Sequence, residues 1–191
     1  MIHRKLNILE LHRMSIQEYK QSRKVPLVCV LDDVRSMYNV GSVFRTADAM
    51  RIEEMVLCGI TPRPPHPEIH KTALGAEESV DWTYQRDTMQ AVSELKQRGY
   101  MAFAVEQAKE SILLHKFADE IDSFWGIDVL RRGIAIVLGN EVNGVKQEVV
   151  DICDACIEIP QFGTKHSLNV STAAGIVMWE IFKNLIPPTE L

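Results

Sequence analysis

The stretch Ile157-Glu-Ile-Pro-Gln-Phe-Gly-Thr-Lys-His-Ser-Leu-Asn-Val-Ser171 contains three kinds of predicted structure in succession. The apolar run 155–160 is typical of a buried strand. The loop that follows carries polar and cationic side chains, among them Lys165 and Ser167, and a long apolar helix begins at Asn169. A strand that ends in a polar loop and a helix amino terminus is where α/β proteins bind ligands. We therefore expect the functional site in this stretch.

Further apolar runs predict the other strands of the same sheet. They lie at 27–31, 54–58, 80–84, 100–105 and 133–138. Stretches with helical spacing of apolar residues alternate with them, at 39–50, 71–78, 88–98 and 145–151 and from 169 onward. This alternation predicts an α/β fold with a mainly parallel sheet and helices on both faces. The loops after residues 31, 105, 138 and 160 should then meet at one edge of the sheet.

The predicted helix 39–50 has an unusual start. Asn39 is expected to cap it, and Gly41 in its first turn lets another group approach the backbone closely. Arg45 lies one turn later and should point back towards the helix start, over the mouth of the first strand. Taken alone, Arg45 could equally be a surface arginine on an amphipathic helix.

Size and composition limit the class of protein. A chain of 191 residues, 46% apolar and 25% charged, is typical of one soluble globular domain. Charged residues interrupt every apolar run before it reaches the roughly 18 residues of a membrane span. No apolar core or cleavage site follows the basic amino terminus, as a secretory signal would require. We expect a cytoplasmic protein that does not enter a membrane.

Charge is distributed unevenly along the chain. Residues 1–24 hold six basic and two acidic side chains, a charge of +4, so that −9 remains for the rest of a chain of net charge −5. Within this basic arm, Ser15 and Glu18 predict a capping box for a helix at 16–23. A basic arm on an acidic domain, 25–191, suits a polyanionic partner. The alternative is a solvated terminal helix.

Cysteines and histidines give no convincing metal site. Cys153 and Cys156 form a C-x-x-C pair, but no second cysteine pair or pair of histidines stands at zinc-finger spacing. We expect all four cysteines to be structural thiols in a reducing compartment. His66 and His70 are four residues apart beside a proline-rich loop, and no third ligand is evident near them. Both histidines are expected to be loop residues, and no metal is expected to bind.

Three loops carry the candidate chemistry, at 39–45, 139–144 and 159–171. None contains a dinucleotide-binding or P-loop glycine pattern, and no hydrolase nucleophile elbow is present. Their functional groups suit a polyanion beside a small neutral or zwitterionic ligand. These groups are the backbone amides of Gly139 and Gly163, the Glu141 carboxylate, the cations of Arg45 and Lys165, and the polar side chains of Ser167 and Asn169.

Taken together, the three segments resemble the motifs of the SpoU/TrmH family of RNA ribose 2′-O-methyltransferases, in the SPOUT superfamily. The first is Asn39-Val-Gly-Ser-Val-Phe-Arg-Thr-Ala47 and the second is Ile136-Val-Leu-Gly-Asn-Glu-Val-Asn-Gly144. The third runs from Ile159 to Ser171, and the segment Ala73–Glu78 also resembles the family. The likeness covers roughly residues 26–186 in the right order, which is more specific than any single motif. Gln161 and Phe162 depart from the usual third motif and leave the substrate subgroup open.

The resemblance implies a SPOUT methyltransferase domain at 25–191 with a C-terminal deep trefoil knot. It also implies a homodimer that binds S-adenosyl-L-methionine and RNA, either tRNA, which we favour, or rRNA. Cofactor-binding residues would be Val105, Leu138, Gly139, Ile159, Ser167 and Leu168. Catalytic residues would be Arg45, Asn39, Glu141 and Asn169, and substrate would be bound by Arg45, Lys165 and Gly41.

Two other functions fit the same motifs. A knotted methyltransferase could act on an RNA base instead of a ribose. A knotted dimer could also bind RNA without catalysis, although Arg45, Glu141 and Asn169 are all retained and argue against it.

Overall fold

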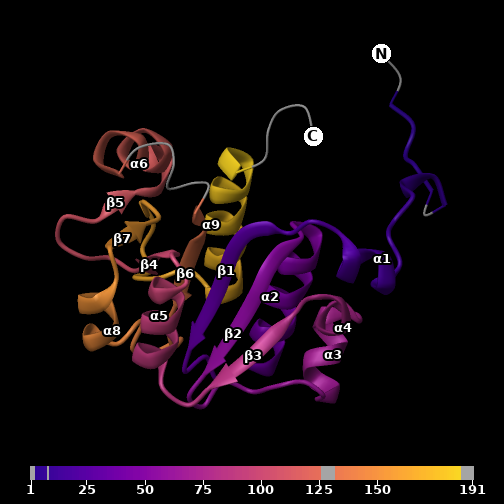
Figure 1. The fold of residues 1–191 in the computed structure, drawn as a ribbon, viewed down its shortest axis with the longest axis horizontal. Coiled ribbons are helices and arrows are strands. Elements are labelled where there is room, and N and C mark those ends of the chain that lie inside the picture. Colours follow the sequence, from indigo (N-terminus) through magenta and orange to yellow (C-terminus); the bar gives the residue numbers. More distant parts are fainter. Residues whose placement is uncertain (1–2, 8, 126–131, 186–191) are drawn as a thin grey trace.

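The computed structural model describes residues 3–7, 9–125 and 132–185 and has the predicted α/β architecture (Figure 1). Seven parallel strands form one sheet in the order β3-β2-β1-β6-β4-β7-β5. The strands are β1 (Val25–Asp32), β2 (Ile52–Cys58), β3 (Trp82–Gln85), β4 (Met101–Val105), β5 (Ile112–Leu113), β6 (Ile134–Leu138) and β7 (Ala155–Glu158). The prediction of a mainly parallel sheet is therefore confirmed.

Helices connect these strands and terminate the described chain. The α-helices are α1 (Ile16–Gln21), α2 (Met37–Ala49), α3 (Pro67–Ala73), α4 (Ala76–Ser79), α5 (Thr88–Gln97), α6 (Phe117–Trp125), α8 (Gln147–Ile152) and α9 (Val170–Leu185). Two short 3-10 helices are η1 (Leu9–Leu11) and η2 (Leu114–Lys116). No helix in the described part of the chain is long and apolar enough to cross a membrane.

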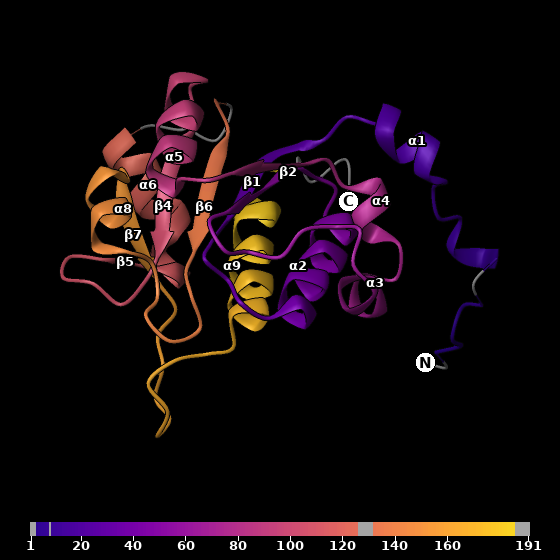
Figure 2. The ribbon, with the colours of Figure 1, turned by 90° about the horizontal axis from the view of Figure 1, so that it is seen from below.

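The sheet separates two apolar cores, and Figure 2 shows helices on both of its sides. Successive side chains of a strand point to opposite faces. In β1, Leu27, Cys29 and Leu31 therefore face one core, whereas Val28 and Val30 face the other. Helices α2, α3, α6 and α9 cover the first face, and α5 and α8 cover the second. Burial on both faces explains why these strands are continuously apolar.

Two details of the predicted helices are wrong. Ser36, not Asn39, caps α2: its hydroxyl accepts a hydrogen bond from the Asn39 amide. The helix expected at 71–78 is two helices, α3 and α4, because Leu74 and Gly75 adopt positive φ angles of 54° and 92° between them. His66 caps the start of α3 and His70 lies within it, so His70 is not a loop residue.

Part of the basic arm packs against the domain. The predicted capping box of Ser15 and Glu18 is present at the start of α1. Tyr19 of this helix is buried in the first core, and Lys20 forms an ion pair with Asp81 at the entry to β3. The segment after Ser15 therefore belongs structurally to the domain.

All four cysteines are free thiols, and Cys29 and Cys58 are buried. Burial raises the pKa of the Cys58 thiol to about 12, and burial does the same for Cys153. Neither thiol is therefore activated as a thiolate at neutral pH.

Gly41 is a packing residue. It is buried, and a Cβ atom there would lie 2.3 Å from the carbonyl oxygen of Ile69 and 2.1 Å from the Thr72 hydroxyl, both in α3. The close approach predicted at this glycine is real, but the approaching group is helix α3. The predicted role of Gly41 in substrate binding stays a prediction, and its packing role is what the structure describes.

Replacing Gly41 with alanine should lower the free energy of unfolding by about 1–3 kcal/mol, because the added methyl group would push α3 away from α2. Gly175 in α9 is the matched control, since a Cβ atom there meets only Thr46 Cγ2 at 3.9 Å. Gly175→Ala should be neutral or stabilising through better helix propensity. Urea unfolding of both variants measures the difference, and equal effects would contradict this account of Gly41.

Candidate functional site

A pocket of about 490 Å³ opens at the carboxyl edge of the sheet. It lies where the loops after β4, β6 and β7 meet the start of α9, as the parallel topology predicts. Its wall includes Val105, Glu106, Gln107, Leu138, Gly139, Asn140, Glu141, Ile157, Ile159, His166, Ser167, Leu168 and Asn169. Figure 2 shows the loop between β7 and α9 extending beyond the body of the domain at this edge.

Three polar side chains from separate motifs meet at this pocket. The Asn39 side-chain amide donates to Glu141 Oε1 at 2.9 Å, and the Asn169 amide donates to Asn39 Oδ1 at 3.1 Å. Asn169 also caps α9, because its Oδ1 accepts from the Ser171 amide at 2.9 Å. The chain thus fixes Asn39 between a carboxylate and a helix cap, although residues 39 and 169 are 130 positions apart.

Glu141 also holds the loop that follows β1. Its carboxylate accepts backbone hydrogen bonds from Arg35 at 2.9 Å and Ser36 at 3.0 Å. With the bond from Asn39, this makes three described donors to one carboxylate. Such an arrangement fixes the Glu141 side chain and ties the start of α2 to the loop after β6.

The loop 139–144 is tightly closed. Asn140 and Gly144 exchange backbone hydrogen bonds of 3.0 and 2.9 Å, and the Asn140 side chain donates to the Asp33 carbonyl at 2.7 Å. A Cβ atom at Gly139 would lie 2.0 Å from the carbonyl carbon of Gly144. Only glycine fits at residue 139, so the turn exposes main chain to the pocket at this point.

Two residues after β4 complete the site and were not among the predicted site residues. Glu106 Oε1 accepts from the Val145 amide at 3.2 Å. The Gln107 side-chain amide donates to the His166 carbonyl at 2.6 Å and so holds the loop between β7 and α9. Their position directly after a parallel strand was the one sequence signal that could have identified them.

The pKa of Glu141 lies below its usual value of 4.5. Burial alone would raise it, but the hydrogen bonds from Arg35, Asn39 and Ser36 together outweigh that effect. A carboxylate with a lowered pKa stabilises the fold above its unfolded-state pKa, and that contribution is lost as pH falls through the folded-state value.

Glu141→Gln should therefore be less stable than the parent chain at neutral pH. The difference in unfolding free energy should shrink as pH falls below about 4.5, because the parent carboxylate becomes protonated. Urea unfolding of both proteins between about pH 7 and pH 3 measures this. A difference that stays constant with pH would show that Glu141 does not act through its charge.

The structure gathers most of the predicted site residues. All six predicted cofactor residues line the pocket, as do Glu141 and Asn169, and Asn39 reaches it through its hydrogen bonds. Lys165 is exposed in the loop between β7 and α9. Arg45 is exposed on α2, outside the pocket wall, and no described residue forms a hydrogen bond or ion pair with it. The functional roles of these residues stay predictions.

Comparison with known proteins gives consistent results. Residues 26–179 match the profile of the SpoU rRNA Methylase family. A 23S rRNA (guanosine-2′-O-)-methyltransferase, RlmB, of Neisseria meningitidis serogroup B is 32% identical over 165 residues, which are 86% of this chain and 61% of that protein. The chain spans 61–63% of the length of the curated relatives it matches.

Solved structures share the fold. The TrmH/SpoU tRNA modifying enzyme of A. aeolicus superposes with a TM-score of 0.72 at 26% identity, covering 93% of this chain and 84% of that one. An AdoMet-bound rRNA methyltransferase of Sinorhizobium meliloti has the same TM-score at 23% identity, covering 88% of this chain and 61% of that one.

Proposed function

The chain belongs to the SpoU rRNA Methylase family, and on that premise we propose that it is an S-adenosyl-L-methionine-dependent methyltransferase acting on a ribose 2′-hydroxyl of RNA. The observation that carries the proposal is the convergence of Asn39, Glu141 and Asn169 at the rim of one pocket. Each of these residues comes from a different family motif. RlmB of N. meningitidis, named as a guanosine-2′-O-methyltransferase, supports the ribose as the target.

The pocket suits the proposed cofactor. Its volume of about 490 Å³ falls in the range of small-molecule sites. Val105, Leu138 and Ile159 offer apolar surface for an adenine ring, whereas the main chain at Gly139 and Leu168 offers polar groups for the ribose and amino-acid parts. The close contact between Gly139 and Gly144 keeps a side chain from filling this space.

The chain's own residues would position the RNA. Bound S-adenosyl-L-methionine supplies an electrophilic sulfonium methyl group, so the protein must align the attacking hydroxyl with it. Asn39, which is hydrogen-bonded to Glu141, and Asn169, which is hydrogen-bonded to Asn39, would orient the ribose at the pocket rim. Arg45 would bind the adjacent phosphate and stabilise charge that develops on the ribose oxygen. We do not assign it as a base, because a guanidinium stays protonated in proteins.

We further propose the knot and the homodimer that the family resemblance implies. The segment that would thread the knot is the loop between β7 and α9, which Gln107 holds through the His166 carbonyl. Ile176 and Trp179 on α9 are 39% and 54% exposed, and Trp179 stacks on Phe182. An apolar surface of this kind on α9 suits burial against a second copy of the chain. The protein would act in the cytoplasm.

The class of RNA belongs to the proposal as well. We favour tRNA over rRNA, and the A. aeolicus relative, described as a tRNA modifying enzyme, supports this choice. RlmB, described as acting on 23S rRNA, supports the alternative. Sequencing-based maps of 2′-O-methylation in cells with and without the gene would show which RNA loses a methyl group.

Calorimetric titration with S-adenosyl-L-methionine tests the cofactor site. We expect saturable binding, with one cofactor molecule bound in the pocket of each chain. A complete lack of binding by the folded dimer would favour the alternative function, an RNA-binding dimer without catalysis.

Removal of residues 1–14 should weaken RNA binding and reduce its salt dependence. This segment carries Arg4, Lys5 and Arg13 against one acid, Glu10, and it leaves the packed helix α1 intact. Each lost phosphate contact should lower the slope of log K against log salt by about 0.7–0.9. Filter binding at several salt concentrations measures the slope. An unchanged slope would identify the segment as a solvated tail.

A further inference from the structure

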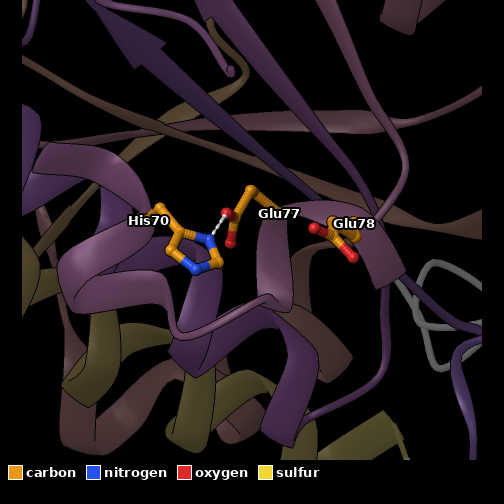
Figure 3. A group of neighbouring side chains, drawn as sticks. All are labelled: His70, Glu77 and Glu78. Atoms are coloured by element: carbon orange, nitrogen blue, oxygen red, sulfur yellow. Dashed lines mark hydrogen bonds and ion pairs between the residues drawn. The ribbon is translucent and has the colours of Figure 1, made fainter. Parts of the chain in front are cut away.

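His70, Glu77 and Glu78 form a compact cluster outside the pocket, and Figure 3 shows Glu77 between the other two side chains. One ligand atom from each residue lies within 4.8 Å of the others. His70 comes from α3 and both glutamates come from α4. The turn at Leu74 and Gly75 folds α4 back beside α3 and brings the three side chains together.

Glu77 is the buried member of the cluster. Its side chain is only 8% exposed, and its Oε1 lies 2.5 Å from His70 Nδ1. Its other oxygen, Oε2, is buried and has no hydrogen-bond partner among the described residues. Buried carboxylate oxygens are almost always satisfied, so this atom indicates that a further group belongs there.

The cluster also has an excess of negative charge. Two carboxylates face one imidazole, and within the described chain no lysine or arginine forms an ion pair with Glu77 or Glu78. The nearest basic residue in sequence, Lys71, instead lies over the ring of Tyr38, 5.7 Å from its centroid. A bound cation would neutralise this excess.

We propose that His70, Glu77 and Glu78 bind one divalent metal ion with the ligand preference of zinc. An imidazole nitrogen with carboxylate oxygens suits zinc, whereas calcium requires six to eight oxygen ligands. Three protein ligands leave a fourth tetrahedral position for water. His70 Nδ1 and Glu77 Oε1 would have to separate to about 3.4 Å, the edge of a tetrahedron with ligand distances near 2.1 Å. The His70 side chain is 62% exposed and is free to make that adjustment.

Such an ion would fasten α4 to α3 across the turn at Leu74 and Gly75. Helix α3 packs in turn against Gly41 at the start of α2, the helix that carries Asn39 and Arg45. The site is therefore structural, and it is independent of the proposed methyl transfer. A third ligand for His70 is not recognisable in the sequence, because the carboxylates reach it only through this turn.

Titration of the metal-free full chain with zinc chloride and cobalt chloride tests the proposal. We expect one saturable site per chain and a cobalt absorption spectrum of tetrahedral type. At 100 times the dissociation constant, zinc should raise the melting temperature by about 5–10 °C. No saturable binding by the folded protein would overturn the proposal.

Two exposed ligands provide variants that should fold normally. His70→Gln and Glu78→Gln should each weaken zinc binding by at least about tenfold. Loss of a residue that only hydrogen-bonds to a metal ligand already costs about that much affinity, and loss of a ligand should cost no less. His115→Gln is the matched control for His70, because His115 is exposed and lies outside the cluster. The double variant Cys153→Ser, Cys156→Ser controls for binding by the C-x-x-C pair. Zinc affinity in Glu78→Gln equal to that of the parent chain, or binding that disappears only in the cysteine variant, would contradict the site.

Discussion

Replacing Arg45 with alanine is expected to abolish methyl transfer to RNA while leaving cofactor affinity nearly unchanged. Arg45 is exposed on α2 and does not line the pocket, so its loss removes no surface from the proposed cofactor site. A side chain that stabilises developing charge contributes mainly in the transition state. Removal of one such group typically costs about 10²–10³-fold in turnover.

Calorimetry with the cofactor and a radiolabelled methyl-transfer assay measure the two properties separately. Arg45→Lys should also be strongly impaired, because an ammonium group cannot replace the planar guanidinium fork at a phosphate. Arg86→Ala is the matched control, since Arg86 is likewise exposed and outside the pocket wall but does not lie on α2. Turnover of Arg45→Ala near that of the parent chain would remove Arg45 from the catalytic set.

Gly139→Ala is expected to abolish cofactor binding and to destabilise the fold. The new Cβ atom would lie 2.0 Å from the carbonyl carbon of Gly144 and 2.1 Å from the Val145 amide nitrogen. These are backbone atoms within a turn closed by the Asn140–Gly144 hydrogen bonds, so they cannot move without opening the turn. Overpacking of this kind costs about 1–3 kcal/mol, and here it displaces the pocket wall itself.

Gly163→Ala is the control for this prediction. Gly163 lies in the neighbouring loop, and a Cβ atom there meets nothing within 4 Å. This variant should keep the cofactor affinity and the melting temperature of the parent chain. Calorimetry and thermal melting of the two variants provide the comparison, and a Gly139→Ala protein that binds cofactor normally would disprove the role of this turn.

The sheet could be predicted from sequence because its strands are buried on both faces. Runs such as 27–31 and 133–138 contain no polar residue. A strand buried on both faces has this continuous apolar pattern regardless of which helices cover it. Parallel topology then placed the loops after residues 138 and 160 at one edge, which is where Leu138 and Ile159 line the pocket. The individual residues predicted for the site came from the resemblance to the family motifs.

Features that depend on contacts between distant elements could not be predicted. Asn39 has the local pattern of a helix cap, yet its side chain donates a hydrogen bond to Glu141, and Ser36 caps α2 instead. Gly41 has the local pattern of an open backbone, yet α3 fills the space beside it. The pairing of His70 with Glu77 requires a turn with two positive φ angles, which no periodicity in the sequence reveals.

The most direct test of the account is the chemical position of the transferred methyl group. Purified protein is incubated with labelled S-adenosyl-L-methionine and with tRNA or rRNA from cells that lack the gene. Each RNA is then hydrolysed with alkali, which cleaves next to a free 2′-hydroxyl but not next to a methylated one. We expect the label in an alkali-resistant dinucleotide that yields a 2′-O-methyl nucleoside by mass spectrometry. Label recovered only as a base-methylated nucleoside, or no transfer to either RNA, would contradict the proposed function.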